Sequence, residues 1–200
     1  MNDEYRTIET EATGYFKDKG SKFFAYAYPI KNEDEVKDII QALKKEHHSA
    51  RHHCYAWRMG TEEIATRAND DGEPSSTAGK PILGQLTSYD ITNILVVVVR
   101  YFGGTLLGVS GLINAYKSAT IEVLENADIL TKRIENTFEL RFEYPLLNTV
   151  MQTLKQEGLD ITTTDFKESC RLLFSVGKSE ALKAQQTFEN IYGVAIKKIS

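Results

Sequence analysis

Residues Asp70 to Lys117 read DDGEPSSTAGKPILGQLTSYDITNILVVVVRYFGGTLLGVSGLINAYK. The centre of this stretch, Ile94 to Arg100, is apolar and mostly β-branched, and its length favours a strand covered on both faces over a helix. An acidic loop rich in Gly, Pro, Ser and Thr precedes the strand, and Tyr101-Phe102-Gly103-Gly104 follows it. A helical pattern then begins near Gly111. A buried strand, a glycine turn and a helix start can together bring backbone N–H groups up to a ligand.

The bulk composition limits the class of protein. The chain has 200 residues, of which 42% are hydrophobic and 26% charged, which predicts one large or two small globular domains. The sequence shows no apolar run of transmembrane length, and its acidic start does not resemble a signal peptide. The two cysteines, Cys54 and Cys170, lie far apart and indicate no disulfide framework. We therefore expect a cytoplasmic protein that does not contact membranes.

The net charge of −4 argues against a strong general DNA-binding protein, because such binding needs a basic face that releases counterions from phosphates. A local basic site on the folded surface remains compatible with this total.

The first half of the chain predicts a mixed α/β domain. Alternating residues from Tyr5 to Phe16 indicate a strand that forms a hairpin with Ser21 to Pro29. Asn32 and Glu35 are spaced as a capping box for a helix that ends near Glu46. Further elements are expected as follows: a strand at Tyr55–Arg58, an edge strand at Ile64–Asn69 and a short helix at Pro81–Leu86.

The second half restarts the pattern after Asn126. Its predicted strands and helices follow the order β-α-β-β-α-β, which is the ferredoxin-like arrangement, with Pro145 and Ser179 at the starts of the two helices. We therefore predict an α+β chain with two domains, residues 1–130 and 131–200.

Four glycines follow the central strand: Gly103, Gly104, Gly108 and Gly111. They could form a backbone cradle for a phosphate at a helix N-terminus. Their spacing matches neither the dinucleotide-binding fingerprint nor a Walker loop. A tight turn with close helix–sheet packing would also require glycine, so both interpretations stay open.

The acidic loop places Asp70, Asp71 and Glu73 within four positions. These carboxylates could hold magnesium, or they could form a solvated turn. The neighbouring hydroxyl groups and Lys80 suit an anion better than a cation.

A histidine-rich segment invites a zinc interpretation, with His52 and Cys54 expected on one side of a strand. No second pair of ligands stands at finger spacing, so we expect a hydrogen-bonded or surface site and no metal. Cys54 beside a histidine could in principle form a nucleophile pair, but adjacency in sequence is poor evidence for that geometry.

Basic residues are interleaved with aromatic residues around the central strand, which is the chemistry of single-stranded nucleic-acid binding. Aromatic residues on strands can equally belong to the core. The residues concerned are Arg51, Arg58, Arg67, Lys80, Arg100 and Lys117, with Tyr55, Trp57, Tyr101 and Phe102.

Three segments closely resemble the IMPACT/YigZ family: Ala50–Ala56, Asp71–Pro81 and Val98–Leu112, within a resemblance that covers roughly residues 15 to 125. The resemblance implies an N-terminal ribosomal-protein-like α/β domain of the type found as domain IV of elongation factor G. It also implies a ferredoxin-like C-terminal domain similar to the last domain of that factor, and a link to translation. The family usually has Gly where Ser76 stands and often Arg where Asn114 stands, which weakens any ligand role at the second position.

Two functions follow as hypotheses. The first is a cytoplasmic translation-associated regulatory protein that contacts RNA, the ribosome or a translation protein, without a cofactor. Its expected surface comprises Arg51, His52, Glu73, Thr77, Gly79, Lys80, Arg100, Tyr101, Phe102, Gly103, Gly104, Gly108 and Gly111. In this hypothesis Arg100, Lys80 and the glycine N–H groups hold phosphate.

The alternative is a magnesium-dependent phosphoester hydrolase or nucleotide-binding enzyme. Asp70, Asp71 and Glu73 would hold the metal, and His52 would act as general base. The residues supply no complete catalytic set, so we favour a binding protein without assigned catalytic residues.

Overall fold

The computed structural model describes residues 3–166 and 169–199. It divides into two compact units, Tyr5–Lys132 and Arg133–Ser200, and the second also includes Met1–Glu4. We call them the N-terminal unit and the C-terminal unit.

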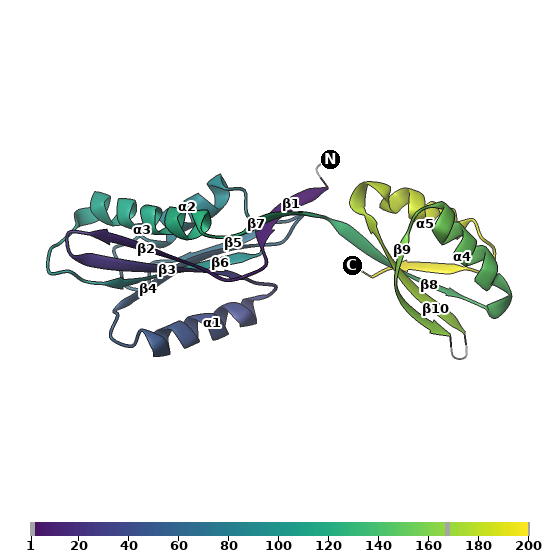
Figure 1. The fold of residues 1–200 in the computed structure, drawn as a ribbon, viewed down its shortest axis with the longest axis horizontal. Coiled ribbons are helices and arrows are strands. Elements are labelled where there is room, and N and C mark those ends of the chain that lie inside the picture. The colour runs from purple at the N-terminus through teal and green to yellow at the C-terminus, as the bar shows by residue number, and fades with distance from the viewer. Residues whose placement is uncertain (1–2, 167–168, 200) are drawn as a thin grey trace. The chain divides into compact units, whose positions relative to one another are not determined.

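The N-terminal unit is built on a five-stranded antiparallel sheet that lies between helices (Figure 1). The strand order is β2 (Ala12–Asp18), β3 (Ser21–Pro29), β6 (Ile94–Tyr101), β4 (His52–Met59) and β5 (Ala65–Asn69). Helices α2 (Gly79–Ser88) and α3 (Gly108–Glu125) cover one face, and α1 (Glu33–Glu46) covers the other.

The central strand β6 is buried along its length, as its composition predicts. All residues from Ile94 to Arg100 are buried. Val96 and Val98 pack into the core beneath α2 and α3, whereas Val97 and Val99 belong to the core beneath α1. Because side chains alternate along a strand, Arg100 points to the α2–α3 face and Tyr101 to the α1 face.

The expected capping of α1 is confirmed. The Asn32 side chain accepts hydrogen bonds from the backbone N–H groups of Asp34 and Glu35, both at 3.0 Å. Glu35 reaches back to the backbone N–H of Lys31 at 2.8 Å. The helix ends at Glu46, as predicted.

The single strand predicted from Tyr5 to Phe16 is wrong. The chain bends after Ile8 and forms two strands, β1 (Glu4–Ile8) and β2. β1 leaves the main sheet and pairs with β7 (Ile129–Arg133), a strand that the sequence pattern did not indicate. Alternation alone predicts an extended backbone, but it does not identify the partner strand or a bend between two partners.

The C-terminal unit has the predicted β-α-β-β-α-β order. Its elements are β8 (Glu135–Phe142), α4 (Leu147–Gln156), β9 (Asp160–Phe166), β10 (Cys170–Gly177), α5 (Ala181–Glu189) and β11 (Ala195–Lys198). The antiparallel sheet has the order β11-β8-β10-β9, and α4 and α5 pack against one face of it (Figure 1).

Short 3-10 turns, η1 (Tyr144–Leu146) and η2 (Lys178–Glu180), precede the two helices of this unit. Pro145 lies in η1, directly before α4, and satisfies the expectation of a helix start there. The predicted cap by Ser179 is wrong, because Ser179 lies inside η2 and its backbone N–H donates to Asp3 Oδ2 at 2.7 Å. Within the described residues, no helix is both long and apolar enough to cross a membrane.

Candidate functional site

The acidic loop is fastened to the sheet by Glu73. Arg100 Nη1 on β6 donates to Glu73 Oε1 at 2.7 Å, and the Tyr116 hydroxyl on α3 donates to the same oxygen at 2.8 Å. The Arg100 and Glu73 side chains are only 7% and 3% exposed. The acidic loop, β6 and α3 therefore lie in contact, as the sequence led us to expect. The contact between them is a buried ion pair.

Arg100 is enclosed by aromatic rings as well as paired. Its guanidinium carbon lies 5.7 Å from the ring centres of both Phe23 and Phe102. Its Nε is buried and has no hydrogen-bond partner among the described residues. Because its charge is balanced by Glu73 and its side chain is covered, Arg100 acts here as a clamp and offers little to an external phosphate.

Asp70, which precedes α2 in the chain, caps the N-terminus of that helix with its carboxylate. Its carboxylate accepts the backbone N–H groups of Ser76, Ala78 and Gly79 at 2.8 to 3.0 Å. Partial burial acts to raise the pKa of Asp70, but these three hydrogen bonds outweigh it and lower the pKa. The carboxylate thus replaces the side-chain cap that Ala78 cannot provide.

The three loop carboxylates do not converge on a common point. Asp71 Oδ2 accepts the backbone N–H of His53 at 2.7 Å, and its Oδ1 pairs with Lys44 at 3.0 Å. Asp70 and Glu73 have the separate partners given above. Across residues 3–166 and 169–199, no three His, Cys, Asp or Glu residues are grouped to hold a metal ion. The ligand set of the magnesium hypothesis is therefore not assembled.

His52 and Cys54 lie on one side of β4, as expected, opposite Arg100 and Val98 of β6. His52 Nδ1 lies 3.0 Å from the Asp71 carbonyl oxygen. The Cys54 thiol donates to the Asp70 carbonyl oxygen and to the Tyr116 hydroxyl, at 3.0 and 3.3 Å. Burial raises the pKa of the Cys54 thiol, so a nucleophilic thiolate is disfavoured there.

The other predicted loop residues divide into buried and exposed groups. The Thr77 hydroxyl donates to the Pro74 carbonyl oxygen at 2.6 Å and is buried. A Cβ added at Gly79 would lie 2.5 Å from the Asn69 nitrogen, so glycine is required for packing. Arg51 and Lys80 are exposed, so a partner can reach both of these cations.

The four glycines of the predicted cradle serve different purposes. A Cβ on Gly103 would lie 1.9 Å from the carbonyl carbon of Gly20, so this position is fixed by close packing against the β2–β3 turn. Gly104 and Gly108 have φ of +87° and +72° and face open space. Gly111 has only the Leu107 side chain close by, at 3.0 Å. Backbone is thus open at Gly104 and Gly108, at the start of α3.

Tyr101 lies on the opposite face from Arg100. Its hydroxyl lies 2.8 Å from His47 Nδ1, and the Tyr26 hydroxyl lies 2.7 Å from His47 Nε2. Together with Phe24 and Phe102, Tyr101 and His47 line a cavity of about 330 Å³. The predicted surface is therefore split between the two faces of the sheet.

Apart from Phe102, the exposed apolar side chains of this region were not predicted from the sequence. Phe102, Leu106, Val109 and Ile113 are 57%, 83%, 60% and 39% exposed. We call Phe102–Ile113 the 102–113 segment. Phe102 and the glycines of this segment were predicted as site residues, whereas Leu106, Val109 and Ile113 were not.

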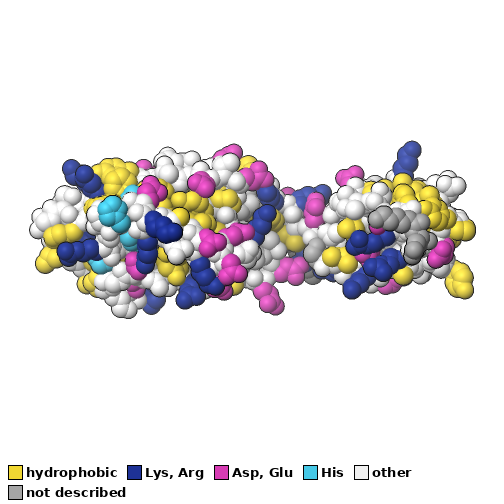
Figure 2. All heavy atoms as spheres, turned by 90° about the horizontal axis from the view of Figure 1, so that it is seen from below, with side chains coloured by type: hydrophobic (Ala, Val, Ile, Leu, Met, Phe, Trp, Pro, Cys, Tyr) yellow, Lys and Arg dark blue, Asp and Glu magenta, His cyan; other side chains and the backbone are white. Residues whose placement is uncertain are grey.

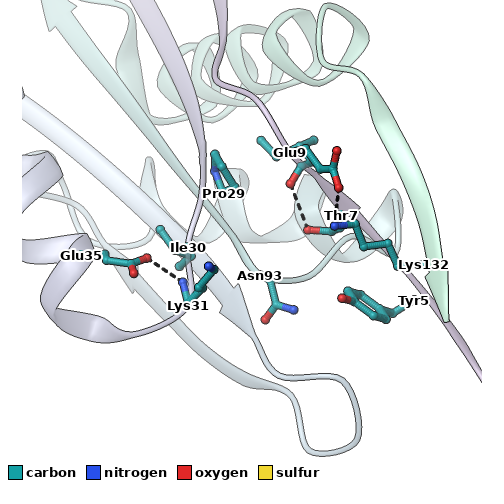
Figure 3. A pocket seen from close by; sticks show the side chains of 10 residues that line it. Tyr5, Thr7, Glu9, Pro29, Ile30, Lys31, Glu35, Asn93 and Lys132 are labelled. Carbon is teal, nitrogen blue, oxygen red and sulfur yellow. Dashed lines mark hydrogen bonds and ion pairs between the residues drawn. The ribbon is translucent and has the colours of Figure 1, made fainter. Parts of the chain in front are cut away.

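A separate cavity of about 680 Å³ lies at the other end of the unit, against the β1–β7 ribbon (Figure 3). None of the predicted site residues lines it. Lys132 Nζ contacts Glu9 Oε1 at 2.5 Å, the backbone N–H of Lys31 donates to Glu35 Oε2 at 2.8 Å, and the two acidic and two basic lining residues balance in charge. It offers no unbalanced charge to select a ligand.

Comparison with known sequences finds one matching family model and several related proteins. The family model for the Impact N-terminal domain matches residues 19–124. An IMPACT family member from Haemophilus influenzae is 32% identical over 173 residues, which cover 84% of each chain. The IMPACT family member YigZ from Escherichia coli is 34% identical over 151 residues, which cover 74% of each chain.

One solved structure matches the fold of the whole chain. A crystal structure of a hypothetical protein superposes with a TM-score of 0.71 at 27% identity, covering 100% of this chain and 99% of the other. A structure described as the two-domain translational regulator Yih1 is 28% identical with a TM-score of 0.40, covering 58% of this chain and 46% of the other.

Proposed function

This chain belongs to the IMPACT family, and we propose that it is a translation-associated regulatory protein that binds a protein of the translation machinery through the 102–113 segment. The link to translation comes from the resemblance to the family. The choice of surface comes from the exposure of the segment.

Exposed apolar side chains next to a closely packed turn carry the proposal. Leu106 is 83% exposed, whereas the adjacent Leu107 is 7% exposed and belongs to the core. The segment is held at its start by Gly103, whose N–H donates to Ser21 Oγ at 3.1 Å. Full burial of one such leucine in an interface would contribute about 1.5–3 kcal/mol. Gathered exposed apolar residues of this kind mark interaction sites.

The absence of charge favours a protein over RNA as the partner of this surface. The sequence FGGTLLGVSGLI from Phe102 to Ile113 contains no charged residue. Nearby Arg100 is buried and paired with Glu73. An RNA strand would find backbone N–H groups and the exposed Lys22, which lines a cavity together with Phe102, whereas an apolar protein surface would find four exposed side chains.

We extend the proposal to the architecture and the location. The N-terminal unit would correspond to the ribosomal-protein-like domain, with its end near residue 130, and the C-terminal unit would be ferredoxin-like. The observed β-α-β-β-α-β order and the sheet order support the second assignment. A protein with this partner would act in the cytoplasm.

Sedimentation with ribosomes and with the soluble translation factors of a cell extract tests the proposal. We expect co-migration of the protein, a reduction of at least fivefold in the variant carrying Leu106→Ser and Val109→Ser, and survival of the complex after RNase treatment of the factor fraction. Leu182→Ser is the matched control, because Leu182 is 67% exposed on α5 of the other unit. Co-migration that the double variant leaves unchanged would contradict the proposal.

A further inference from the structure

Two arginines face one another on the sheet of the C-terminal unit. Arg141 on β8 and Arg171 on β10 are directly paired in register. Their neighbours Leu140 and Leu172 belong to the core under α4 and α5, so the arginines point to the opposite, uncovered face. Like charges in directly opposed positions destabilise a sheet, and the pair therefore requires a local compensation.

Glu139 supplies that compensation and fixes both guanidinium groups. Arg141 Nε donates to Glu139 Oε1 at 2.6 Å, and Arg171 Nε donates to Glu139 Oε2. The Glu139 side chain is 6% exposed, but those of Arg141 and Arg171 are 64% and 46% exposed. Each arginine thus gives one N–H to the carboxylate. Its terminal nitrogens have no partner within the described residues and remain accessible to solvent.

A shallow hollow of about 300 Å³ adjoins this arrangement. Glu139, Arg141, Ala195 and Lys197 line it with Ile196. Ala195 and Lys197 on β11 are in register with Arg141 and Glu139, so a small residue faces the arginine and a lysine faces the carboxylate. The cations Arg141, Arg171 and Lys197 therefore lie around the Glu139 carboxylate.

The positive charge is concentrated on one side of this face. Asp165 on β9 is in register with Arg171, and Asp160 with Ser175, so β9 carries acidic residues. The excess of cations lies over β8 and β11, where the hollow is. Figure 2 shows Lys and Arg side chains gathered on the face of this unit that it views.

We propose that the face formed by Arg141, Arg171 and Lys197 binds the phosphodiester backbone of single-stranded RNA. The planar guanidinium forks match the oxygens of a phosphate, and Glu139 holds them in place before the ligand arrives. The face has no exposed aromatic platform at these register positions, so it contacts phosphates and tolerates any sequence. The choice of RNA as the source of phosphate rests on the proposed function in translation, whereas the surface is distinct from the 102–113 segment.

Fluorescence anisotropy with a labelled 16-nucleotide RNA of mixed sequence, titrated with the full chain between 50 and 200 mM salt, tests the proposal. We expect Lys197→Gln and Arg141→Gln each to weaken binding roughly fivefold and to reduce the salt slope by about 0.7 per lost phosphate contact. Lys198→Gln is the matched control. It removes the same charge one residue further on, from a position in register with the core residue Phe138.

Three results would overturn the proposal: no RNA binding at 50 mM salt, equal weakening by Lys198→Gln, or displacement of the RNA by polyglutamate at equal charge concentration, which would indicate an acidic protein partner. Among the described residues the ion pairs of Glu139 are with Arg141 and Arg171 and not with Lys197. The Lys197 variant therefore stays informative if Arg141→Gln unfolds the unit. Leu106→Ser with Val109→Ser should leave RNA affinity unchanged, which separates this test from that of the proposed function.

Discussion

At the scale of single residues, Ser76 combines a left-handed backbone conformation with a side chain that is not the one expected there. Ser76 has a φ of +65°, in the left-handed region that glycine adopts most easily. The resemblance to the IMPACT family led us to expect glycine there. The Asp70 carboxylate accepts the Ser76 N–H at 2.8 Å and helps to hold this conformation.

Ser76→Gly should therefore stabilise the N-terminal unit. A residue other than glycine in this conformation costs about 1–2 kcal/mol, and the greater freedom of glycine in the unfolded chain takes back part of the gain. We predict a net increase of about 0.5–1 kcal/mol in the free energy of unfolding, measured by urea titration with the fluorescence of Trp57. Ser75→Gly, which relieves no positive φ, should destabilise slightly. A loss of stability in Ser76→Gly would contradict the account of this loop.

The buried pair of Glu73 and Arg100 carries the second prediction at this scale. Removal of one partner leaves a buried charge without its counterpart, which costs about 3–5 kcal/mol. Glu73→Gln should therefore lower the free energy of unfolding by about 3 kcal/mol. Asp34→Asn breaks an exposed pair with Lys37 and should leave the free energy of unfolding nearly unchanged. Equal effects of the two substitutions would show that the Glu73 pair does not fasten the loop.

At the scale of elements, close contact between two turns sets the position of the 102–113 segment. Gly103 packs against the turn between β2 and β3, and a Cβ there would overlap the backbone of Gly20 and Ser21. Gly103→Ala should therefore destabilise the unit by about 3 kcal/mol, since neither backbone can yield without displacing its strand. Gly84→Ala on α2 meets nothing within 4 Å and should stabilise by about 0.5 kcal/mol. Thermal unfolding of both variants tests this prediction. An unchanged stability in Gly103→Ala would contradict the packing role assigned to Gly103.

The elements that could be predicted from the sequence are those that local composition or local hydrogen bonds determine. The run from Ile94 to Arg100 is apolar at every position before the arginine, and only a strand covered on both faces buries it. The Asn32 cap is likewise local, because donor and acceptor lie within three residues. The pairing of β1 with β7 is not local, and no residue in either strand specifies it.

The candidate site was only partly predictable for the same reason. The sequence indicated that Glu73 and Arg100 share one region. In the folded chain both side chains are buried and paired with each other, so they hold the loop on the sheet and do not face a ligand. Alternation along β6 separates Tyr101 from Arg100, which could have been foreseen once the strand was placed. The exposure of Leu106 depends on the path of the chain between Gly104 and Gly108, and neither composition nor periodicity reports that path.

At the scale of the whole molecule, each unit has its own core and its own charged cluster. Two hydrogen bonds from Arg141 and Arg171 lower the pKa of Glu139 in the C-terminal unit. A carboxyl with a lowered folded pKa contributes stability that is fully present above its ordinary value of 4.5 and is lost as the pH falls through the folded pKa. The stability conferred by Glu139 should therefore fade only below about pH 4.5.

Comparison of the wild type with Glu139→Gln tests this prediction. Thermal unfolding followed by far-ultraviolet circular dichroism should show the variant less stable at pH 6, by about 2 kcal/mol, because the two arginines are partly solvated. The difference should shrink as the pH falls from 4.5 toward 3. Trp57, the only tryptophan, lies in the N-terminal unit and should report the same transition in both proteins. A difference that is constant from pH 6 to pH 3 would contradict the assignment.

Site-specific photocrosslinking from position 106 in living cells tests the central claim most directly. A crosslinkable residue replaces Leu106 in one variant and Leu182, which is also exposed, in the control. The captured chains are identified by mass spectrometry. The account predicts that position 106 captures a ribosomal protein or a translation factor, that position 182 does not, and that Val109→Ser reduces the yield. Capture of RNA in place of protein at position 106, or the same partners from both positions, would contradict it.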